Sequence, residues 1–285
     1  MILIKHITAP VLFSAITVLL PASGAHAIAL GNAQELAPHR AVYEMTLDTT
    51  RPAKGVSGVQ GRMVFEFAGS GCDGYTMNMR LVTRVEAKTG QASMNDLRSS
   101  TWEQGAGRQY RFNSSQYQGE KLEDSTSGDA ERVDKGNHVV VHVRVPKAKY
   151  IEVDGPVLFP TQHSLMILRA AKSGKRVLQA RVYDGSSSGD KVYATTAFIG
   201  KKLRPGDRIP AKKIANDEKL EKLDSWLVSI SYFDTVEETR ETPIYQLNFR
   251  LYKNGVSREL LIDYGDFAIK GVLSSLEFMS APECK

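Results

Sequence analysis

The sequence predicts a mainly β protein: a long antiparallel sheet of a dozen or more short strands, with one helix near the middle of the chain. Apolar and polar residues alternate in many segments, which is the period of a strand with one dry and one wet face. Turn-forming pairs such as Asp73-Gly74 and Asn254-Gly255 separate those segments. Only residues 160–174 carry helical periodicity. Hairpin-linked strands of this kind are typical of a barrel, a sandwich or a wound sheet.

Composition excludes several classes of protein. The chain has 285 residues, 42% of them hydrophobic, so it can bury a large core and is unlike a disordered chain. Its net charge of +5 is far below that of a nucleic-acid-binding domain. Two cysteines cannot build a four-thiolate zinc site or an iron–sulfur cluster, and no phosphate-binding loop or dinucleotide fingerprint is present. We therefore expect no metal, no cofactor and no nucleic-acid partner.

The first 27 residues are predicted to be a cleaved secretory signal peptide. Lys5 supplies the positive charge, residues 7–20 are uncharged and mostly apolar, and the segment 25–27 (Ala-His-Ala) fits the cleavage rule. That apolar run is shorter than the roughly 20 residues that span a bilayer. We therefore expect an exported protein without a stable membrane span, whose residues 28–285 form a single domain.

Export changes the meaning of Cys72 and Cys284. In an oxidising compartment an even pair of cysteines is expected to form a disulfide. The bridge would close a loop of 284 − 72 = 212 residues, worth about 5 kcal/mol in the chain-entropy model. Two free thiols or an exchange-active pair are the alternatives, although no C-x-x-C arrangement supports redox catalysis. Our hypothesis is a structural clasp between the C-terminal tail and the first third of the chain.

Alternating segments on both sides of the helix predict the strands in order. Each has apolar residues at every second position and polar residues between them. Before the helix, the apolar faces consist of Tyr43, Met45 and Leu47; Met63, Phe65 and Phe67; Met77, Met79, Leu81 and Val85; and Val139, Val141, Val143 and Val145. After the helix, they consist of Trp226, Val228, Ile230 and Tyr232, and of Leu247, Phe249 and Leu251.

The helix over residues 160–174 has recognisable ends. Thr161 is the predicted N-cap and Gly174 the predicted C-terminal stop. Leu165 and Leu168 form an apolar stripe that we expect to pack against the sheet. The segment 146–176 is the expected boundary between two β halves. Residues 201–222 are charged and rich in turn formers, which predicts a long solvated loop with a short helix near its end.

Three motifs resemble patterns of catalytic or metal-binding sites. The segment 185–189 (Gly-Ser-Ser-Ser-Gly) matches a nucleophile elbow, but strand-like residues flank it on both sides, so we expect a hairpin loop. His138 and His142 lie four apart on a predicted strand, about 13 Å from each other, which is too far for one metal ion. His163 lies in the first turn of the predicted helix and is the one candidate base. Capping, packing or a buried hydrogen bond is the better interpretation for it.

Several segments together resemble one family. The most specific is the run from Leu251 (LYKNGV) to Phe267 (DYGDF), and the predicted signal peptide and the cysteine pair fit the same pattern. The other segments are 159–163 (FPTQH), 226–233 and 242–245 (TPIY). Over about residues 38–285 the chain resembles the EipB-like cell-envelope integrity proteins of alphaproteobacteria.

The resemblance implies a fold and a role. The fold is a β-spiral, a long antiparallel sheet wound into a partly closed barrel with one central helix, similar to the lipoprotein carriers LolA and LolB. A disulfide of the family maps onto Cys72 and Cys284. The implied role is maintenance of the envelope under stress, in the periplasm and without enzymatic activity, so no catalytic residues carry over.

We therefore predict a non-enzymatic, monomeric periplasmic protein that supports cell-envelope integrity. It would bind an envelope component, either a lipid, a lipoprotein or an envelope protein, in the groove of the spiral, because a wound sheet leaves a concave face. Two alternatives stay open: an envelope hydrolase that uses His163, and a pure protein-interaction module that uses an exposed sheet edge. Candidate residues of the inner face are Met79, Trp226, Tyr232 and Phe249.

Overall fold

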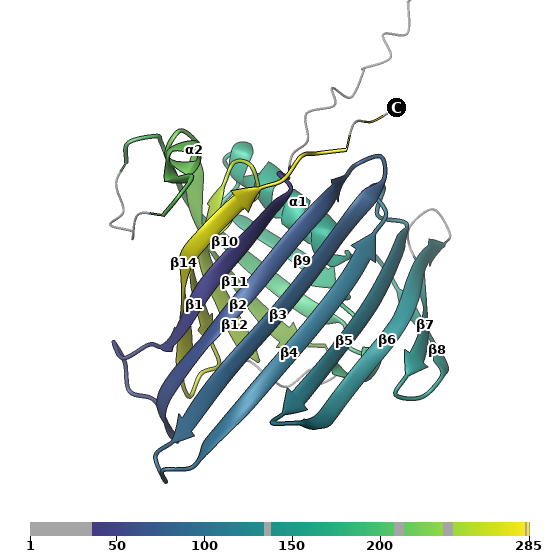
Figure 1. Ribbon diagram of the computed structural model, residues 1–285. Coiled ribbons are helices and arrows are strands. Elements are labelled where there is room, and N and C mark those ends of the chain that lie inside the picture. The colour runs from purple at the N-terminus through teal and green to yellow at the C-terminus, as the bar shows by residue number, and fades with distance from the viewer. Residues whose placement is uncertain (1–35, 134–137, 208–213, 236–241, 283, 285) are drawn as a thin grey trace, which may run out of the picture. The chain divides into compact units, whose positions relative to one another are not determined.

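A single antiparallel sheet of fourteen strands dominates the computed structural model, in the part of the chain that it describes: residues 36–133, 138–207, 214–235, 242–282 and 284 (Figure 1). The predicted signal peptide lies outside the described residues. The strands are β1 (His39–Leu47), β2 (Val56–Ser70), β3 (Gly74–Ala87), β4 (Ala92–Glu103), β5 (Gln109–Gln118), β6 (Lys121–Val133), β7 (His138–Val145), β8 (Lys149–Asp154), β9 (Val177–Val182), β10 (Tyr193–Leu203), β11 (Ser225–Asp234), β12 (Tyr245–Tyr252), β13 (Ser257–Asp263) and β14 (Ala268–Phe278). The helices are α1 (Pro160–Lys172), α2 (Asp217–Glu221) and the 3-10 turn η2 (Ser187–Gly189).

The order of the strands joins two meanders in the middle of the sheet. Strands β1 to β8 follow one another on one side, and β9 to β14 follow one another on the other. The first and last strands pair with each other, so that His39 lies opposite Phe278 and Leu47 opposite Ile269. The two free edges, β8 and β9, therefore come from the middle of the chain, on either side of α1.

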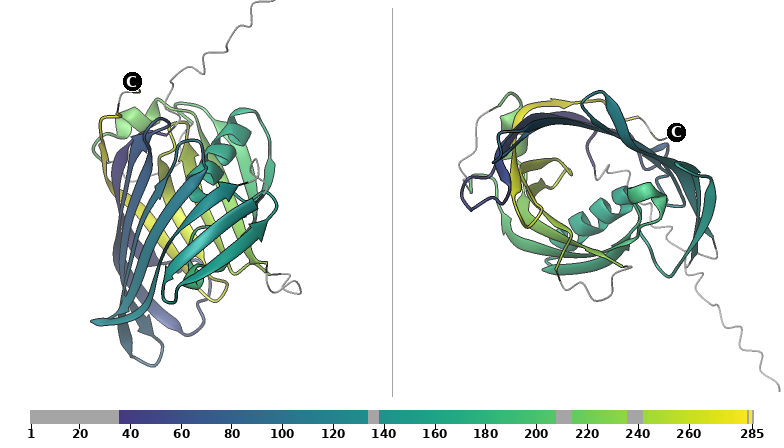
Figure 2. Two further views of the ribbon diagram at one scale, coloured as in Figure 1. Left: turned by 90° about the vertical axis from the view of Figure 1, so that its right-hand side faces the viewer. Right: turned by 90° about the horizontal axis from the view of Figure 1, so that it is seen from below.

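The sheet curls around α1 without closing. Seen from below, the strands follow an incomplete ring, and the helix lies inside it (Figure 2). A mainly β chain with a long open antiparallel sheet and one central helix is the fold that the sequence predicted, and this prediction is confirmed. Twist of the strands accounts for the curl, since a long twisted sheet coils instead of staying flat.

The N-terminus of α1 differs from the prediction. Thr161 is not the N-cap: that residue is Phe159, whose side chain makes no capping hydrogen bond, and Pro160 follows at the first helical position. The Glu103 carboxylate at the end of β4 replaces a local cap, because it accepts the backbone N–H groups of Thr161 (2.7 Å) and Gln162 (3.0 Å). The cap therefore comes from a residue far away in the sequence.

The predicted C-terminal stop of α1 is confirmed. Gly174 has a positive φ of 78°, a backbone conformation that favours glycine. Its N–H donates to the carbonyl of Ala171, and the next N–H, of Lys175, donates to Ala170. These two bonds satisfy carbonyls that the end of a helix would otherwise leave free.

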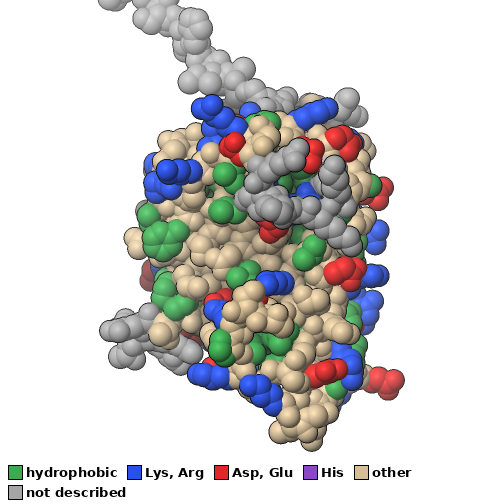
Figure 3. All heavy atoms as spheres, turned by 90° about the vertical axis from the view of Figure 1, so that its left-hand side faces the viewer, with side chains coloured by type: hydrophobic (Ala, Val, Ile, Leu, Met, Phe, Trp, Pro, Cys, Tyr) green, Lys and Arg blue, Asp and Glu red, His purple; other side chains and the backbone are tan. Residues whose placement is uncertain are grey.

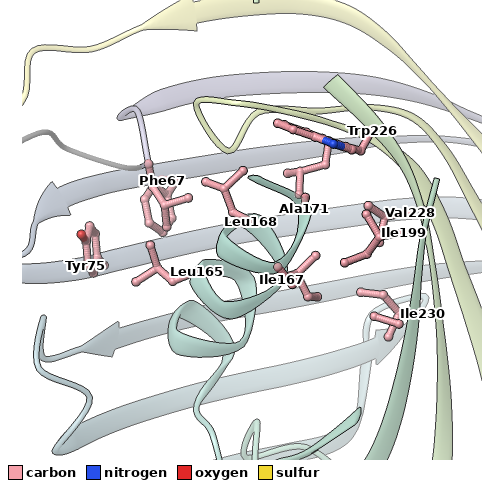
Figure 4. Close-up of a cluster of buried hydrophobic side chains, with 14 residues drawn as sticks. Phe67, Tyr75, Leu165, Ile167, Leu168, Ala171, Ile199, Trp226, Val228 and Ile230 are labelled. Carbon is pink, nitrogen blue, oxygen red and sulfur yellow. The ribbon is translucent and has the colours of Figure 1, made fainter. Parts of the chain in front are cut away.

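The helix packs its apolar stripe against both meanders. Leu165 points toward Phe67 and Tyr75 of the first meander, and Ile167 points toward Ile230 of the second (Figure 4). Leu168 is fully buried. The expected packing of the Leu165–Leu168 stripe against the sheet is confirmed. Because it touches strands from both halves, α1 stabilises the curl of the sheet from the inside.

The segment 201–222 is only partly the solvated loop that was expected. Strand β10 continues to Leu203, and α2 forms the predicted short helix near the end of the segment. Leu220 of α2 is fully buried against strands β1, β2 and β14, and Ile214 is packed against the same cluster. A charged sequence thus contains two apolar residues that attach it to this core cluster.

A disulfide joins Cys72 and Cys284, whose Cα atoms lie 5.7 Å apart. Cys72 lies in the turn between β2 and β3, and Cys284 follows β14. The bond therefore connects the first meander to the residues that follow the second. It does so in addition to the β1–β14 pairing. The clasp between the C-terminal tail and the first third of the chain is present.

Candidate functional site

A cavity of about 400 Å³ lies between α1 and the inner face of the sheet. This size is within the range of sites that hold small apolar molecules. Strands of both meanders and the start of the helix form its wall. The lining side chains are largely apolar: Leu36, Met63, Phe65, Phe67, Met77, Met79, Ile167, Val182, Ile230, Leu247, Phe249, Leu251, Leu260 and Ile262.

Three of the four residues predicted for the inner face line this cavity: Met79, Tyr232 and Phe249. Each is only partly buried by protein, as expected for a side chain that faces a void. Trp226 does not line it. The indole packs above Ala171 of the helix and is 3% exposed, so it belongs to the core (Figure 4). Whether the three lining residues bind a ligand stays a prediction.

The cavity is elongated along the strands. On β12, Tyr245, Leu247, Phe249 and Leu251 occupy successive inward positions and all line it. Six residue steps of a strand cover about 20 Å. One end of the cavity lies near Gly255 and the other near Tyr245. An apolar lining of this length matches that of an extended hydrocarbon chain.

Gly255 belongs to the hairpin between β12 and β13 that the Asn254-Gly255 pair predicted. Its φ is +86°, and a Cβ atom on it would lie 2.4 Å from Cδ2 of Leu36. Both the conformation and the close approach require glycine here. The turn thereby lets the segment before β1 cover one end of the cavity.

Tyrosines gather at the opposite end. Tyr232 and Tyr245 face each other across β11 and β12 and stack, with ring centroids 4.4 Å apart. Tyr193 meets Tyr232 edge-on at 6.2 Å, and Tyr264 lies 6.4 Å from Tyr245. Tyr264 is 43% exposed. The row of rings thus runs from inside the sheet to the solvent, and we call these four residues the tyrosine row.

Asp184 lies beside the tyrosine row in the wall of the cavity. Its Oδ1 accepts the backbone N–H of Ser186 at 2.9 Å, and the Ser186 hydroxyl contacts the hydroxyl of Tyr193 at 2.9 Å. Burial raises the pKa of the Asp184 carboxyl, an effect that the Ser186 hydrogen bonds oppose. Within the described ranges, no Lys, Arg or His side chain forms an ion pair with it.

His163, in the first turn of α1, also lines the cavity. It is 4% exposed, and its Nε2 lies 3.3 Å from the hydroxyl of Thr195. Burial lowers the pKa of His163 to about 4, so the ring is neutral near pH 7. Among the described residues no carboxylate hydrogen-bonds to this ring. The arrangement agrees with the buried hydrogen bond that the sequence favoured.

The remaining motifs occupy structural positions. The segment 185–189 connects β9 and β10 and contains η2, so it is the expected hairpin loop. His138 and His142 lie on β7, where His138 contacts Asp154 at 2.9 Å and His142 stacks on Tyr150 at 4.6 Å. Within the described residues, no three His, Cys, Asp or Glu side chains gather closely enough to hold a metal ion.

The outer face contrasts with the cavity. On the side of the molecule that carries α2, Lys, Arg, Asp and Glu side chains are interspersed, and hydrophobic side chains form small separate spots (Figure 3). The described part of the chain has no helix with the length and apolar character needed to cross a bilayer.

An open sheet curled around one helix, with an apolar cavity between them, defines the class as a β-barrel-like protein. Residues 30–280 match the family model described as EipB-like, and the chain belongs to this family. The cell envelope integrity protein EipB of Brucella abortus (strain 2308) is 37% identical over 264 residues, which cover 93% of this chain and 92% of that protein.

A solved structure agrees with the fold. The crystal structure of a beta-barrel-like protein of a domain of unknown function from Brucella abortus is similar with a TM-score of 0.78. The two chains are 36% identical, and the match covers 87% of this chain and all of that one. The resemblance to the EipB-like family that the sequence indicated is thereby confirmed.

Sequence reasoning missed two residues of the site. Tyr245 alternates with Leu247 and Phe249 and lies in the segment 242–245 that carried the family resemblance, so extending the alternation by one step would have found it. In the sequence, Asp184 precedes Gly185, a pair that is typical of a turn. Its position in the cavity wall follows from the bridge between Leu158 and Val182, a contact that no local pattern encodes.

Proposed function

We propose that this chain is a non-enzymatic envelope protein that binds the apolar part of an envelope lipid or lipoprotein in the cavity between α1 and the sheet. The observation that carries the proposal is the elongated cavity of about 400 Å³ with its largely apolar wall. The name of the Brucella abortus relative, cell envelope integrity protein, supports the envelope as the place of action. A predicted signal peptide supports the periplasm as the compartment.

Burial of an apolar chain supplies the driving force. Removing apolar surface from water contributes about 25 cal/mol per Å². The wall offers methionine and aromatic side chains, such as Met79 and Phe249, and methionine adapts to ligands of irregular shape. The cavity therefore favours hydrocarbon over polar molecules without requiring a single defined contact.

Filling the cavity tests the proposal. Leu247→Trp adds bulk to an inward position of β12, so we expect binding of a fluorescent fatty-acid probe to weaken roughly tenfold or more, since the added ring occupies the ligand's volume. Leu227→Trp is the matched control, because Leu227 lies on the neighbouring strand β11, is 49% exposed and does not line the cavity. Titration of the probe against the folded wild type and both variants measures the effect.

Two results would contradict the proposal. One is equal affinity of the probe for wild type and Leu247→Trp, which would place the probe elsewhere on the protein. The other is repeated absence of any lipid in native mass spectra of protein purified from the periplasm, together with no probe binding to the wild type.

Neither alternative gains support from a specific observation. A hydrolase needs a nucleophile and an oriented base, whereas His163 contacts Thr195 and lies in an apolar environment. An interaction module would use the edges β8 and β9. The β8 edge carries Lys149, Glu152 and Asp154, the kind of charged edge that opposes pairing with another strand.

A further inference from the structure

We propose that the end of the cavity at Asp184 and the tyrosine row binds a positively charged nitrogen, so that the ligand is an amphiphile with a cationic head group and an apolar tail. The inference rests on the proposed function, since the tail would occupy the apolar channel. It adds the chemical class of the head group and a direction for the bound molecule. The head would lie at Asp184, and the tail would run toward Gly255.

The lack of a cationic partner for Asp184 among the described residues is the first argument. Asp184 is partly buried, and acidic side chains withdrawn from water are usually paired with a cation or fully hydrogen-bonded. The hydrogen-bond donors to Asp184 come from Ser186, and none of the described residues supplies a basic partner. A cation arriving in the cavity would provide the missing charge.

The aromatic surroundings are the second argument. Faces of tyrosine rings attract cations, most strongly where water is excluded, and sites for quaternary ammonium groups are built from such rings. Tyr232 and Tyr245 both line the cavity, and their stack presents aromatic surface next to Asp184. Burial is the main cause of the raised pKa of both hydroxyls, and Asp184 adds to it, for Tyr245 after the effect of Tyr232.

The layout of the cavity is the third argument. Among the described residues that line the cavity, Asp184 is the one carboxylate, and it lies at the tyrosine end, whereas the inward positions Leu247, Phe249 and Leu251 lead away from it along β12. Exposed Tyr264 links this end to solvent. An amphiphile is the molecule whose own polarity follows the same gradient, with its charged head nearest to water.

The net charge of the chain gives the test its discriminating power. At +5, the protein as a whole attracts anions and repels cations. A general electrostatic attraction would therefore favour an anionic amphiphile. A preference for the cation can come only from a local site of opposite charge.

The experiment compares three amphiphiles with the same hydrocarbon tail, all below the concentration at which they form micelles. These are dodecyltrimethylammonium, the neutral glycerol ester monododecanoylglycerol, and dodecanoate. Isothermal titration calorimetry measures each affinity for the wild type, for Asp184→Asn and for Asp124→Asn. The last is the matched control, because Asp124 is an exposed carboxylate on β6 that does not line the cavity.

The readout is the ratio of the affinity for the cation to the affinity for the neutral ester. We expect a ratio of roughly ten or more for the wild type and Asp124→Asn, the size of a desolvated cation contact. For Asp184→Asn, we expect a ratio near one. Asparagine keeps the shape and the acceptor for the Ser186 N–H, and a thermal midpoint close to that of the wild type verifies that the variant is folded.

The outcomes separate the two proposals. If the neutral ester binds and the cation binds no better, or if Asp184→Asn keeps the wild-type ratio, the cationic site is overturned and the apolar cavity stands. If dodecanoate binds best, the cationic site is overturned as well. If none of the three amphiphiles binds the wild type, both the head-group site and the proposed function are overturned.

Discussion

Glu103 shows how one buried carboxylate can connect distant parts of the chain. It is 1% exposed at the end of β4, and it accepts hydrogen bonds from the first two free N–H groups of α1. A negative charge is favourable at the N-terminus of a helix, but burial opposes ionisation. Burial dominates and raises the pKa of Glu103 to about 7.

This pKa makes the stability of the fold depend on pH. The carboxyl binds its proton more tightly when folded than at its ordinary pKa of 4.5. Its contribution to stability is therefore complete below about pH 4.5 and is lost as the pH rises through 7. Relative to Glu103→Gln, whose side chain does not titrate, we expect the wild type to lose about 2–4 kcal/mol of unfolding free energy between pH 4.5 and 8. Urea denaturation at several pH values measures this difference.

The comparison with Glu103→Gln is necessary because two histidines act in the opposite direction. Burial lowers the pKa of both His39 and His163. Their contribution to stability is present above the ordinary pKa of 6.5 and is lost as the pH falls toward the folded value. Both proteins contain these histidines, so the difference between them isolates Glu103. A difference that stays constant from pH 4.5 to 8 would contradict the assignment.

At this scale the sequence is least informative. The pattern at the start of α1 indicated Thr161 as the cap, since threonine is a favourable capping residue. The actual acceptor is 58 residues earlier in the chain. Asp184 likewise looks like a turn residue until the tertiary fold places it in the cavity wall. Side-chain partners that depend on long-range contacts leave no local signature.

At the scale of elements, α1 is held by one face. Leu168 is fully buried, whereas Met166 on the other side of the helix is 37% exposed. We expect Leu168→Ala to lower the unfolding free energy by about 2–5 kcal/mol, since it leaves a void in the core. Met166→Ala, the matched control, should change it by less than about 1 kcal/mol. Chemical denaturation of the two variants gives both values, and equal losses would contradict the assigned orientation of the helix.

Secondary-structure elements were the part of the structure that the sequence predicted best. Alternation located inward residues such as Tyr43 and Val141, because a strand must place its apolar residues on one face. It was wrong at Val145, which is 38% exposed. The pairing of β6 with β7 shifts register close to this residue, and the bulge ends the simple alternation.

At the scale of the whole molecule, the Cys72–Cys284 bond supports the pairing of the two meanders. We expect the double variant Cys72→Ser, Cys284→Ser to lose about 2–5 kcal/mol of unfolding free energy under oxidising conditions, because its unfolded chain is no longer restricted by a closed loop. A reducing agent should lower the stability of the wild type by a similar amount and leave the double variant unchanged. Identical denaturation curves for both proteins without reductant would contradict this role.

The strand order was beyond reach of sequence patterns. Alternation reports which residues face the core, but it does not report which strands are neighbours. Pairing of β1 with β14 joins residues as far apart as His39 and Phe278. The pattern of strands alone left a barrel, a sandwich and a wound sheet equally open, and only the family resemblance selected the wound sheet.

The β1–β14 pairing also determines the order in which the parts of the sheet can form during folding. A chain that emerges with its N-terminus first can form the meander β1–β8 from neighbouring hairpins, and later the meander β9–β14. The pairing of β1 with β14, which joins the two meanders, can form only after the final strand is present. Contacts between residues so distant in the sequence form slowly. Until then β1 has one unpaired edge in the very centre of the future sheet. The sheet therefore cannot be completed until β14, the last strand in the sequence order, has emerged.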